Sequence, residues 1–208
     1  MSPRIFFIGD SFTNGTGDPT SLGWVGRVFA ATMAQGQALT CYNLGIRGDT
    51  SQLIHQRWQR EVHCRLAETA GTGFVFCFGA NDVDLDEDTG QPRVSPADSL
   101  AYAQAILSQA QKLGSVLMIE SPPIADDPEA NRRLALLNRK LAELCLSLQI
   151  PHVSTGQTLL KTAAWMEEAI ANDGAHPNAA GYQALAKIIL QSKQWPQWLE
   201  QLQSPCQS

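Results

Sequence analysis

Short apolar runs alternate with longer amphipathic segments along the 208 residues of this chain. Continuous apolar character, rather than strict alternation, is typical of strands that are buried on both faces of a sheet. The pattern therefore predicts about five strands in a mostly parallel sheet. The predicted strands lie roughly at residues 4–9, 39–44, 73–79, 115–120 and 151–154.

The segments between these runs carry apolar residues at helical spacing. The clearest example is a stripe of leucines, three or four residues apart, that runs from Leu134 to Leu148. Regular alternation of strands and helices predicts one three-layer α/β domain. The predicted helices cover residues 22–35, 50–68, 97–113, 128–149 and 178–192.

The predicted domain covers residues 1–193, and a separate C-terminal segment covers residues 194–208. The sequence Trp-Pro-Gln-Trp at 195–198 predicts a short terminal helix there. The Gln-rich residues that follow are typical of a frayed chain end.

Composition and charge exclude several classes of protein. Hydrophobic residues make up 44% and charged residues 17%, which is an ordinary globular balance. The net charge is −5 and no basic stripe is present, so we expect no nucleic-acid partner. No apolar run reaches about 18 residues, so no stable membrane insertion is expected. The N-terminus has no signal-peptide pattern, so the sequence favours a cytoplasmic location. It predicts no oligomeric state.

Neither the cysteines nor the acidic residues predict a metal or cofactor. The five cysteines are widely spaced and odd in number, without a C-x-x-C pair, which argues against disulfides and a zinc site. Residues 82–88 begin like a calcium loop. However, Glu87 occupies the position that needs glycine, and Arg93 occupies the position that needs a bidentate glutamate. We therefore expect a solvated acidic loop.

Polar, glycine-containing segments follow three of the predicted strands, and a fourth precedes the last predicted helix. Loops after parallel strands open on the same edge of a sheet, so the first three should converge there. The fourth joins them if the last helix starts at that edge. The segments are Gly9-Asp10-Ser11, Asn43 to Thr50, Gly79-Ala80-Asn81-Asp82, and Asp173 to Asn178.

These segments contain the residue types of a nucleophilic hydrolase. The hydroxyl of Ser11 needs a base, and His176 offers an imidazole that titrates near neutral pH. Asp173 can reach the other ring nitrogen across a tight turn and orient it. Candidate donors to a tetrahedral oxyanion are the Ser11 N–H, the Gly48 N–H and the Asn81 amide.

Each of these residues taken alone has an ordinary structural explanation. Ser11 could cap a helix, His176 could lie in a surface loop, and Asn81 could form an Asx turn. Their joint occurrence in this order, at predicted strand ends, favours catalysis. The remaining histidines lie in the middle of a predicted helix or at the start of a strand, and we expect them to be structural: His55, His63 and His152.

The four segments together resemble the blocks of the SGNH hydrolases, also called GDSL-type lipases and esterases. Gly9-Asp10-Ser11 matches the first block, with Phe12 where leucine is commoner. Gly48 best matches the second-block glycine, Gly79 to Asp82 the third block, and Asp173-Gly174-Ala175-His176-Pro177 the last. The resemblance covers about residues 4–190.

This resemblance implies a flavodoxin-like, three-layer α/β/α sandwich without a metal or organic cofactor. It also implies hydrolysis of esters or thioesters, with Ser11, Asp173 and His176 as the triad. The substrate would be a small or lipid-like acyl ester. Alternatives are deacetylation of acetylated sugars, lysophospholipid hydrolysis, or a catalytically silent binding module.

Two positions near the second block have alternative interpretations. Gly45 lies three residues before Gly48 and is the other candidate for the donating glycine. Arg47 is a candidate substrate-binding residue that could attract an anionic group. It could instead pair with an acid such as Asp49 or Asp82.

Overall fold

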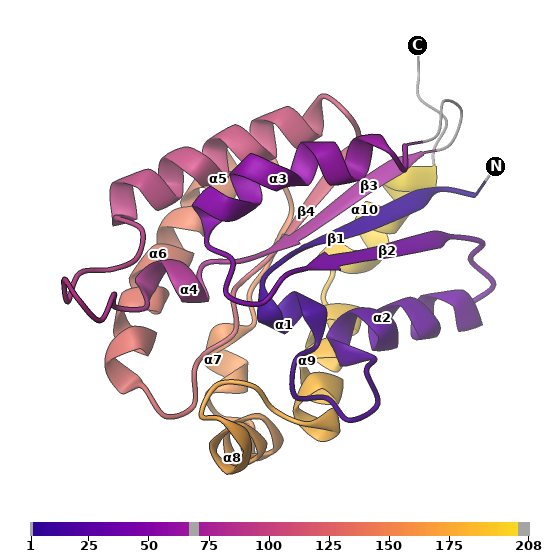
Figure 1. Ribbon diagram of the computed structural model, residues 1–208. Coiled ribbons are helices and arrows are strands. Elements are labelled where there is room, and N and C mark those ends of the chain that lie inside the picture. The colour runs from indigo at the N-terminus through magenta and orange to yellow at the C-terminus, as the bar shows by residue number, and fades with distance from the viewer. Residues whose placement is uncertain (1, 67–70, 204–208) are drawn as a thin grey trace.

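The computed structural model describes residues 2–66 and 71–203. Within these residues, five strands form one parallel sheet in the order β2-β1-β3-β4-β5 (Figure 1). The five predicted strands are thus confirmed, although the last contains only two residues. The strands are β1 (Arg4–Gly9), β2 (Thr40–Gly45), β3 (Thr72–Cys77), β4 (Ser115–Ile119) and β5 (His152–Val153).

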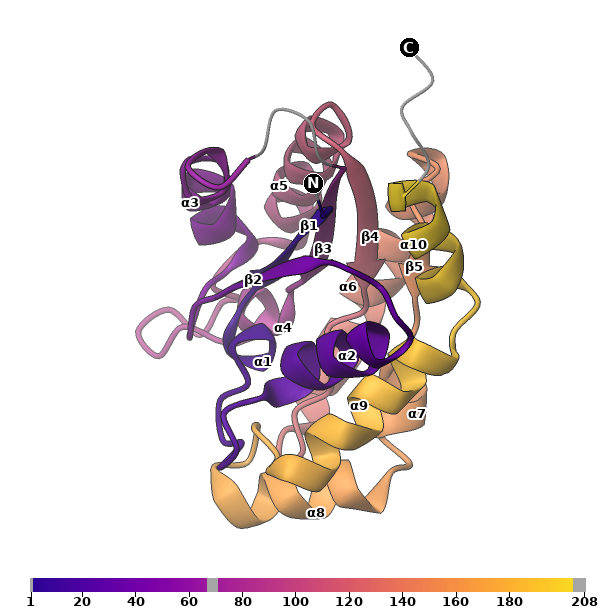
Figure 2. The ribbon, with the colours of Figure 1, turned by 90° about the vertical axis from the view of Figure 1, so that its right-hand side faces the viewer.

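Helices cover both faces of the sheet, which confirms the predicted three-layer α/β/α fold (Figures 1 and 2). One face packs against α3 (Ser51–His63), α5 (Pro96–Gln111) and α6 (Pro128–Ser147). The other packs against α2 (Gly23–Ala34), α9 (Ala179–Gln191) and α10 (Gln194–Gln203). The chain changes faces between α2 and α3, so β1 and β3 lie at the centre of the sheet and β2 at its edge.

The two central strands form the core because both of their faces are covered. Phe7 on β1 packs edge-on against Trp24 of α2, with ring centroids 5.6 Å apart. On the opposite face, Phe74 of β3 meets Trp58 of α3 at 5.9 Å. All four side chains are fully buried. This explains why these strands have continuous apolar sequences.

The C-terminal helix α10 packs on the same core. Trp195 and Trp198 are almost fully buried, and their rings lie 5.4 Å apart. Gly73 on β3 makes room for this contact, because a Cβ there would lie 2.7 Å from a ring carbon of Trp198. The terminal helix expected after residue 193 therefore covers part of the sheet. Helix α10 continues into the Gln-rich tail as far as Gln203, and the rest of that tail, residues 204–208, lies outside the described residues.

Capping residues explain where the main helices begin. The Ser95 hydroxyl accepts from Asp98 N–H at 3.2 Å, and Pro96 occupies the first turn of α5. The helix predicted over residues 50–68 ends earlier, at His63, and its last two predicted residues lie outside the described residues.

Four helices were not predicted from the sequence. Three are single turns without room for a hydrophobic period. The fourth, α8, has only two fully buried positions, Trp165 and Ala169, and so shows no long stripe. They are α1 (Ser11–Asn14), α4 (Ala80–Val83), α7 (Gly156–Leu159) and α8 (Ala163–Asn172).

Candidate active site

Ser11 is the first residue of α1, two positions after the end of β1 at Gly9, and is only 6% exposed. The Asp10 carboxylate caps this helix by accepting from the Phe12 N–H at 3.0 Å. Gly9 makes the turn possible, because a Cβ there would lie 2.0 Å from the carbonyl oxygen of Cys77 on β3. The Gly-Asp-Ser sequence thus places the serine hydroxyl at the carboxyl edge of the sheet.

His176 lies beside this serine, as expected if α9 starts at the same edge. Its Nε2 is 2.7 Å from Ser11 Oγ, although the two residues are 165 positions apart. The imidazole packs against the ring of Phe12, with centroids 5.1 Å apart. The Asn172 side-chain amide donates to the His176 carbonyl at 2.9 Å. These contacts hold the ring toward the hydroxyl.

Asp173 lies on the other side of the imidazole, with Oδ2 2.8 Å from His176 Nδ1. Its Oδ1 accepts from the backbone N–H groups of Ala175 and His176, at 3.1 and 2.8 Å. Partial burial disfavours the Asp173 charge, but hydrogen bonds from His176 and Ala175 outweigh it and hold the pKa below its usual value. An ionised Asp173 keeps the proton on Nδ1 and leaves Nε2 free to accept from Ser11.

Loops from two other parts of the chain support the Asp-His turn. Gly174 has a φ of 84°, a conformation that favours glycine, and its carbonyl accepts from Ala125 and Asp126 N–H at 2.8 and 3.2 Å. The Tyr182 hydroxyl on α9 donates to the Thr16 carbonyl at 2.6 Å. The serine and histidine loops are therefore joined beyond their side-chain contact.

The structure separates the two glycines of the second segment. Gly45 ends β2, its N–H donates to Asn43 Oδ1 at 3.0 Å, and its Cα packs closely against α1. Gly48 is the third residue of a turn closed by Asp49 N–H and Ile46 O at 3.3 Å, and its φ is 77°. In the described part of the chain, the Gly48 N–H makes no hydrogen bond. Of these two glycines, Gly48 is therefore the one whose backbone N–H is available to a ligand.

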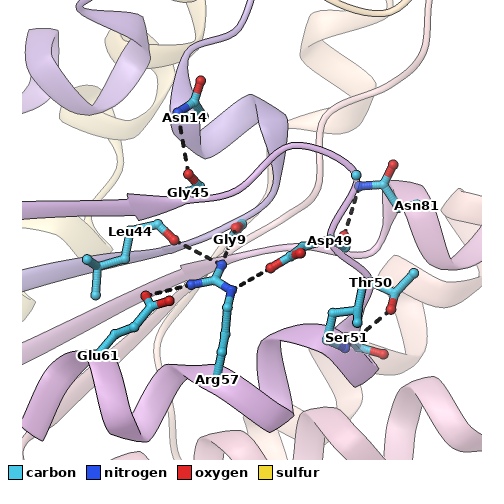
Figure 3. Close-up of polar contacts among 12 residues, drawn as sticks. Gly9, Asn14, Leu44, Gly45, Asp49, Thr50, Ser51, Arg57, Glu61 and Asn81 are labelled. Carbon is cyan, nitrogen blue, oxygen red and sulfur yellow. Dashed lines mark hydrogen bonds and ion pairs between the residues drawn. The ribbon is translucent and has the colours of Figure 1, made fainter.

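Asn81 lies in the single turn α4, after β3. Its side-chain amide donates to the Asp49 carbonyl at 2.8 Å (Figure 3). The next residue, Asp82, accepts from the Ser51 N–H at 2.7 Å, where α3 begins. The second and third segments are thus bonded directly to each other. This is the convergence at the sheet edge that the sequence predicts.

Arg47 does not join this network. It is exposed at the tip of the turn and forms no ion pair with any described residue. Asp49, one of its two suggested partners, pairs instead with Arg57 of α3, with Asp49 Oδ2 2.5 Å from Arg57 Nε. Arg57 cannot be recognised from the sequence, because one arginine in an amphipathic helix looks like part of the solvated face.

Three acidic residues lie around the end of β1. Burial raises the pKa of Asp10 to about 7, against the hydrogen bond from Phe12, and the Asp82 and Asp49 carboxylates add to the rise. Burial also raises the pKa of Asp82, although Ser51 donates to it. Asp10 therefore acts on the backbone as a buried cap that is hard to ionise.

The described residues contain no cluster of three or more histidine, cysteine or acidic side chains suited to a metal ion. In the acidic loop, the exposed Asp86 accepts from the Thr89 backbone N–H and from the Thr89 hydroxyl, both at 3.0 Å.

None of the described helices is long and apolar enough to span a membrane.

Solved structures share this fold at low sequence identity. The acetylxylan esterase Axe2 of Geobacillus stearothermophilus superposes with a TM-score of 0.74 at 22% identity, over 90% of this chain and 92% of that one. The lipase/acylhydrolase from Enterococcus faecalis gives 0.75 at 22% identity, over all of both chains. A lipolytic G-D-S-L protein from Veillonella parvula gives 0.71 at 20%, over 92% and 98%.

No curated protein matches the sequence significantly. The model of the GDSL-like lipase/acylhydrolase family matches residues 7–184, which include every segment of the site described above. With the α/β/α fold and a Gly-Asp-Ser serine at the sheet edge, this match establishes that the chain belongs to the GDSL-like lipase/acylhydrolase family.

Proposed function

We propose that the protein is a serine hydrolase that cleaves carboxylic esters through an acyl-enzyme on Ser11. The observation that carries this proposal is the line of contacts from Ser11 Oγ to His176 Nε2, at 2.7 Å, and from His176 Nδ1 to Asp173, at 2.8 Å. A hydroxyl, a base and an orienting carboxylate in this order are the elements of an activated nucleophile.

The reaction proceeds in two halves. His176 takes the Ser11 proton while Oγ attacks the acyl carbon, and the carbonyl oxygen becomes an oxyanion. When the tetrahedral intermediate collapses, the bond to the leaving oxygen or sulfur breaks and His176 protonates that atom. His176 then deprotonates a water that attacks the acyl-enzyme. Collapse of the second intermediate releases the acid and returns the proton to Ser11.

Three donors from separate segments are proposed to stabilise the oxyanion: the N–H groups of Ser11 and Gly48, and the Asn81 amide. Support comes from the position of Ser11 at a helix start, where its N–H has no intrahelical acceptor. The Gly48 N–H is unpaired among the described residues. Asn81 donates one hydrogen of its side-chain amide to the Asp49 carbonyl. The second amide hydrogen remains available.

The substrate is proposed to be a small or lipid-like acyl ester or thioester. Deacetylation of acetylated sugars is a second candidate, favoured by the structural similarity to an acetylxylan esterase. Lysophospholipid hydrolysis is a further alternative. Arg47 is proposed to contact anionic substrate groups, because it is exposed beside Gly48 and forms no ion pair with described residues.

Hydrolysis of p-nitrophenyl acetate by wild type and Ser11→Ala tests the reaction. We expect turnover to fall by roughly 10³-fold or more in Ser11→Ala, because the nucleophile is lost. Equal rates in both proteins would contradict the proposal. Absence of fluorophosphonate labelling of the wild type would favour a silent binding module.

A substrate panel then separates the candidate substrates. It contains acyl esters of graded length, acyl-CoAs, lysophospholipids and acetylated xylo-oligosaccharides. Arg47→Ala should lose activity on the anionic members of the panel and keep its activity on the others. An unchanged preference for anionic substrates would remove Arg47 from the binding site.

A further inference from the structure

Arg57 reaches from α3 toward the ends of β1 and β2 and bonds four different groups (Figure 3). Its Nη2 donates to the carbonyl oxygens of Gly9 and Leu44, at 3.0 and 2.9 Å. Its Nε lies 2.5 Å from the Asp49 carboxylate, and its Nη1 lies 2.8 Å from Glu61 one turn along the helix. The side chain is only 16% exposed, so most of these contacts are shielded from water.

The acceptors of Arg57 lie next to the groups that would carry out the proposed reaction. Gly9 ends β1, two residues before Ser11, and Leu44 lies near the end of β2. Asp49 directly follows Gly48, and its carbonyl accepts from the Asn81 amide at 2.8 Å. A single guanidinium therefore links the segment that contains Ser11 to the segment that contains Gly48. Through Asp49 it is also linked to the segment that contains Asn81.

The sheet fixes these segments only up to the ends of the strands. The paired register of β1 and β2 ends at Gly9 and Gly45, and one backbone hydrogen bond, from the Ile46 N–H to the Gly9 carbonyl at 3.1 Å, follows it. Since β2 is the edge strand, the outward backbone groups of this strand have no strand partner. Arg57 supplies donors to the Leu44 and Gly9 carbonyls at this end of the two strands.

We propose that Arg57 is a positioning residue that holds the three proposed oxyanion donors in register; this inference rests on the function proposed above. Oxyanion donors are effective because they are held in place before charge develops. The planar fork of arginine suits this task, because it can bond a carboxylate and two carbonyls from one fixed plane. The single ammonium of lysine has no such geometry.

Arg57→Lys is the main test, since it keeps a cation beside the buried Asp49 carboxylate. Arg57→Gln is the second variant. Glu61→Gln is the matched control, because it removes the charge of the outer partner of Arg57 and leaves the contacts of Arg57 with Gly9, Leu44 and Asp49. Fluorophosphonate titration counts competent sites, so that kcat on p-nitrophenyl acetate is expressed per site. Hydrogen exchange over residues 44–50 and 79–83 reports on the link without requiring turnover.

For Arg57→Lys we expect kcat per site to fall by roughly 10- to 100-fold, because a displacement of about 1 Å can cost about 10²-fold. KM should stay within about threefold, since donors to the oxyanion act mainly in the transition state. Exchange over residues 44–50 and 79–83 should be faster than in wild type. Glu61→Gln should match wild type within about twofold.

The positioning role is overturned if kcat per site in both Arg57 variants equals that of Glu61→Gln, or if only the number of titratable sites falls. Unchanged hydrogen exchange in Arg57→Lys would overturn the link itself. Failure of the proposed function would be distinct, because wild type and Ser11→Ala would then hydrolyse the ester equally.

Discussion

Asp10 should make the protein less stable as the pH rises, and Asp10→Asn should remove this dependence. The carboxyl is fully buried, and its pKa is raised from an ordinary value of 3.8 to about 7, mainly by burial. Between these values the native state holds a proton that the unfolded chain has released, so unfolding becomes easier with increasing pH. Above pH 7 the full penalty corresponds to about 4 kcal/mol.

The variant keeps the cap, because an amide oxygen can still accept from the Phe12 N–H, but it cannot ionise. Any cost of fitting the amide nitrogen is independent of pH. The informative quantity is therefore the change with pH of the stability difference between the variant and wild type. From about pH 5 to about pH 8, the stability of Asp10→Asn relative to wild type should rise by about 3 kcal/mol. Urea unfolding followed by tryptophan fluorescence at several pH values measures this difference.

Asp18→Asn is the matched control. Burial disfavours the Asp18 charge, but hydrogen bonds from Arg27, Thr20 and Gly23 outweigh it and lower the pKa to about 2. This carboxylate therefore contributes stability that is present above pH 3.8 and is lost as the pH falls toward 2. Its effect should be constant from about pH 5 to about pH 8. If the stability of Asp10→Asn relative to wild type were also constant over this pH range, the reasoning would be refuted.

Two further predictions concern the triad and the second-segment glycines. Asp173→Asn should lower kcat on p-nitrophenyl acetate by roughly 10³-fold. Two backbone N–H groups hold the Oδ1 position as an acceptor, so the amide nitrogen must face His176 Nδ1 and move the ring proton to Nε2; an unchanged kcat would exclude this orienting role. Gly45→Ala should destabilise the protein by about 3 kcal/mol, because its Cβ would lie 2.2 Å from the Asn14 nitrogen. Gly48→Ala meets open space and should cost only the strain of its positive φ, about 1 kcal/mol. Urea unfolding compares the two, and equal losses would contradict the distinct roles assigned to these glycines.

Local patterns in the sequence predicted most of the fold. The central strands are recognisable because burial on both faces requires continuous apolar residues, as in Phe74 to Phe78. The segments at Ser11 and Asn81 could be assigned to one edge because parallel strands all end there, whereas His176 could be placed there only by assuming that the last helix starts at that edge. Helix α8 was missed because its buried face is short.

Only the tertiary structure decided which groups meet across that edge. It showed that Gly45 packs against α1 while the Gly48 N–H is free of partners among the described residues, a distinction that two nearby glycines in a sequence cannot express. It also showed that Arg57 points inward to strand-end carbonyls and that Asp10 is fully buried. Hydrogen-bond partners and burial depend on residues far away in the chain. Residue types and spacing alone therefore determined the fold class and the candidate reacting groups, whereas chain packing determined their support and electrostatics.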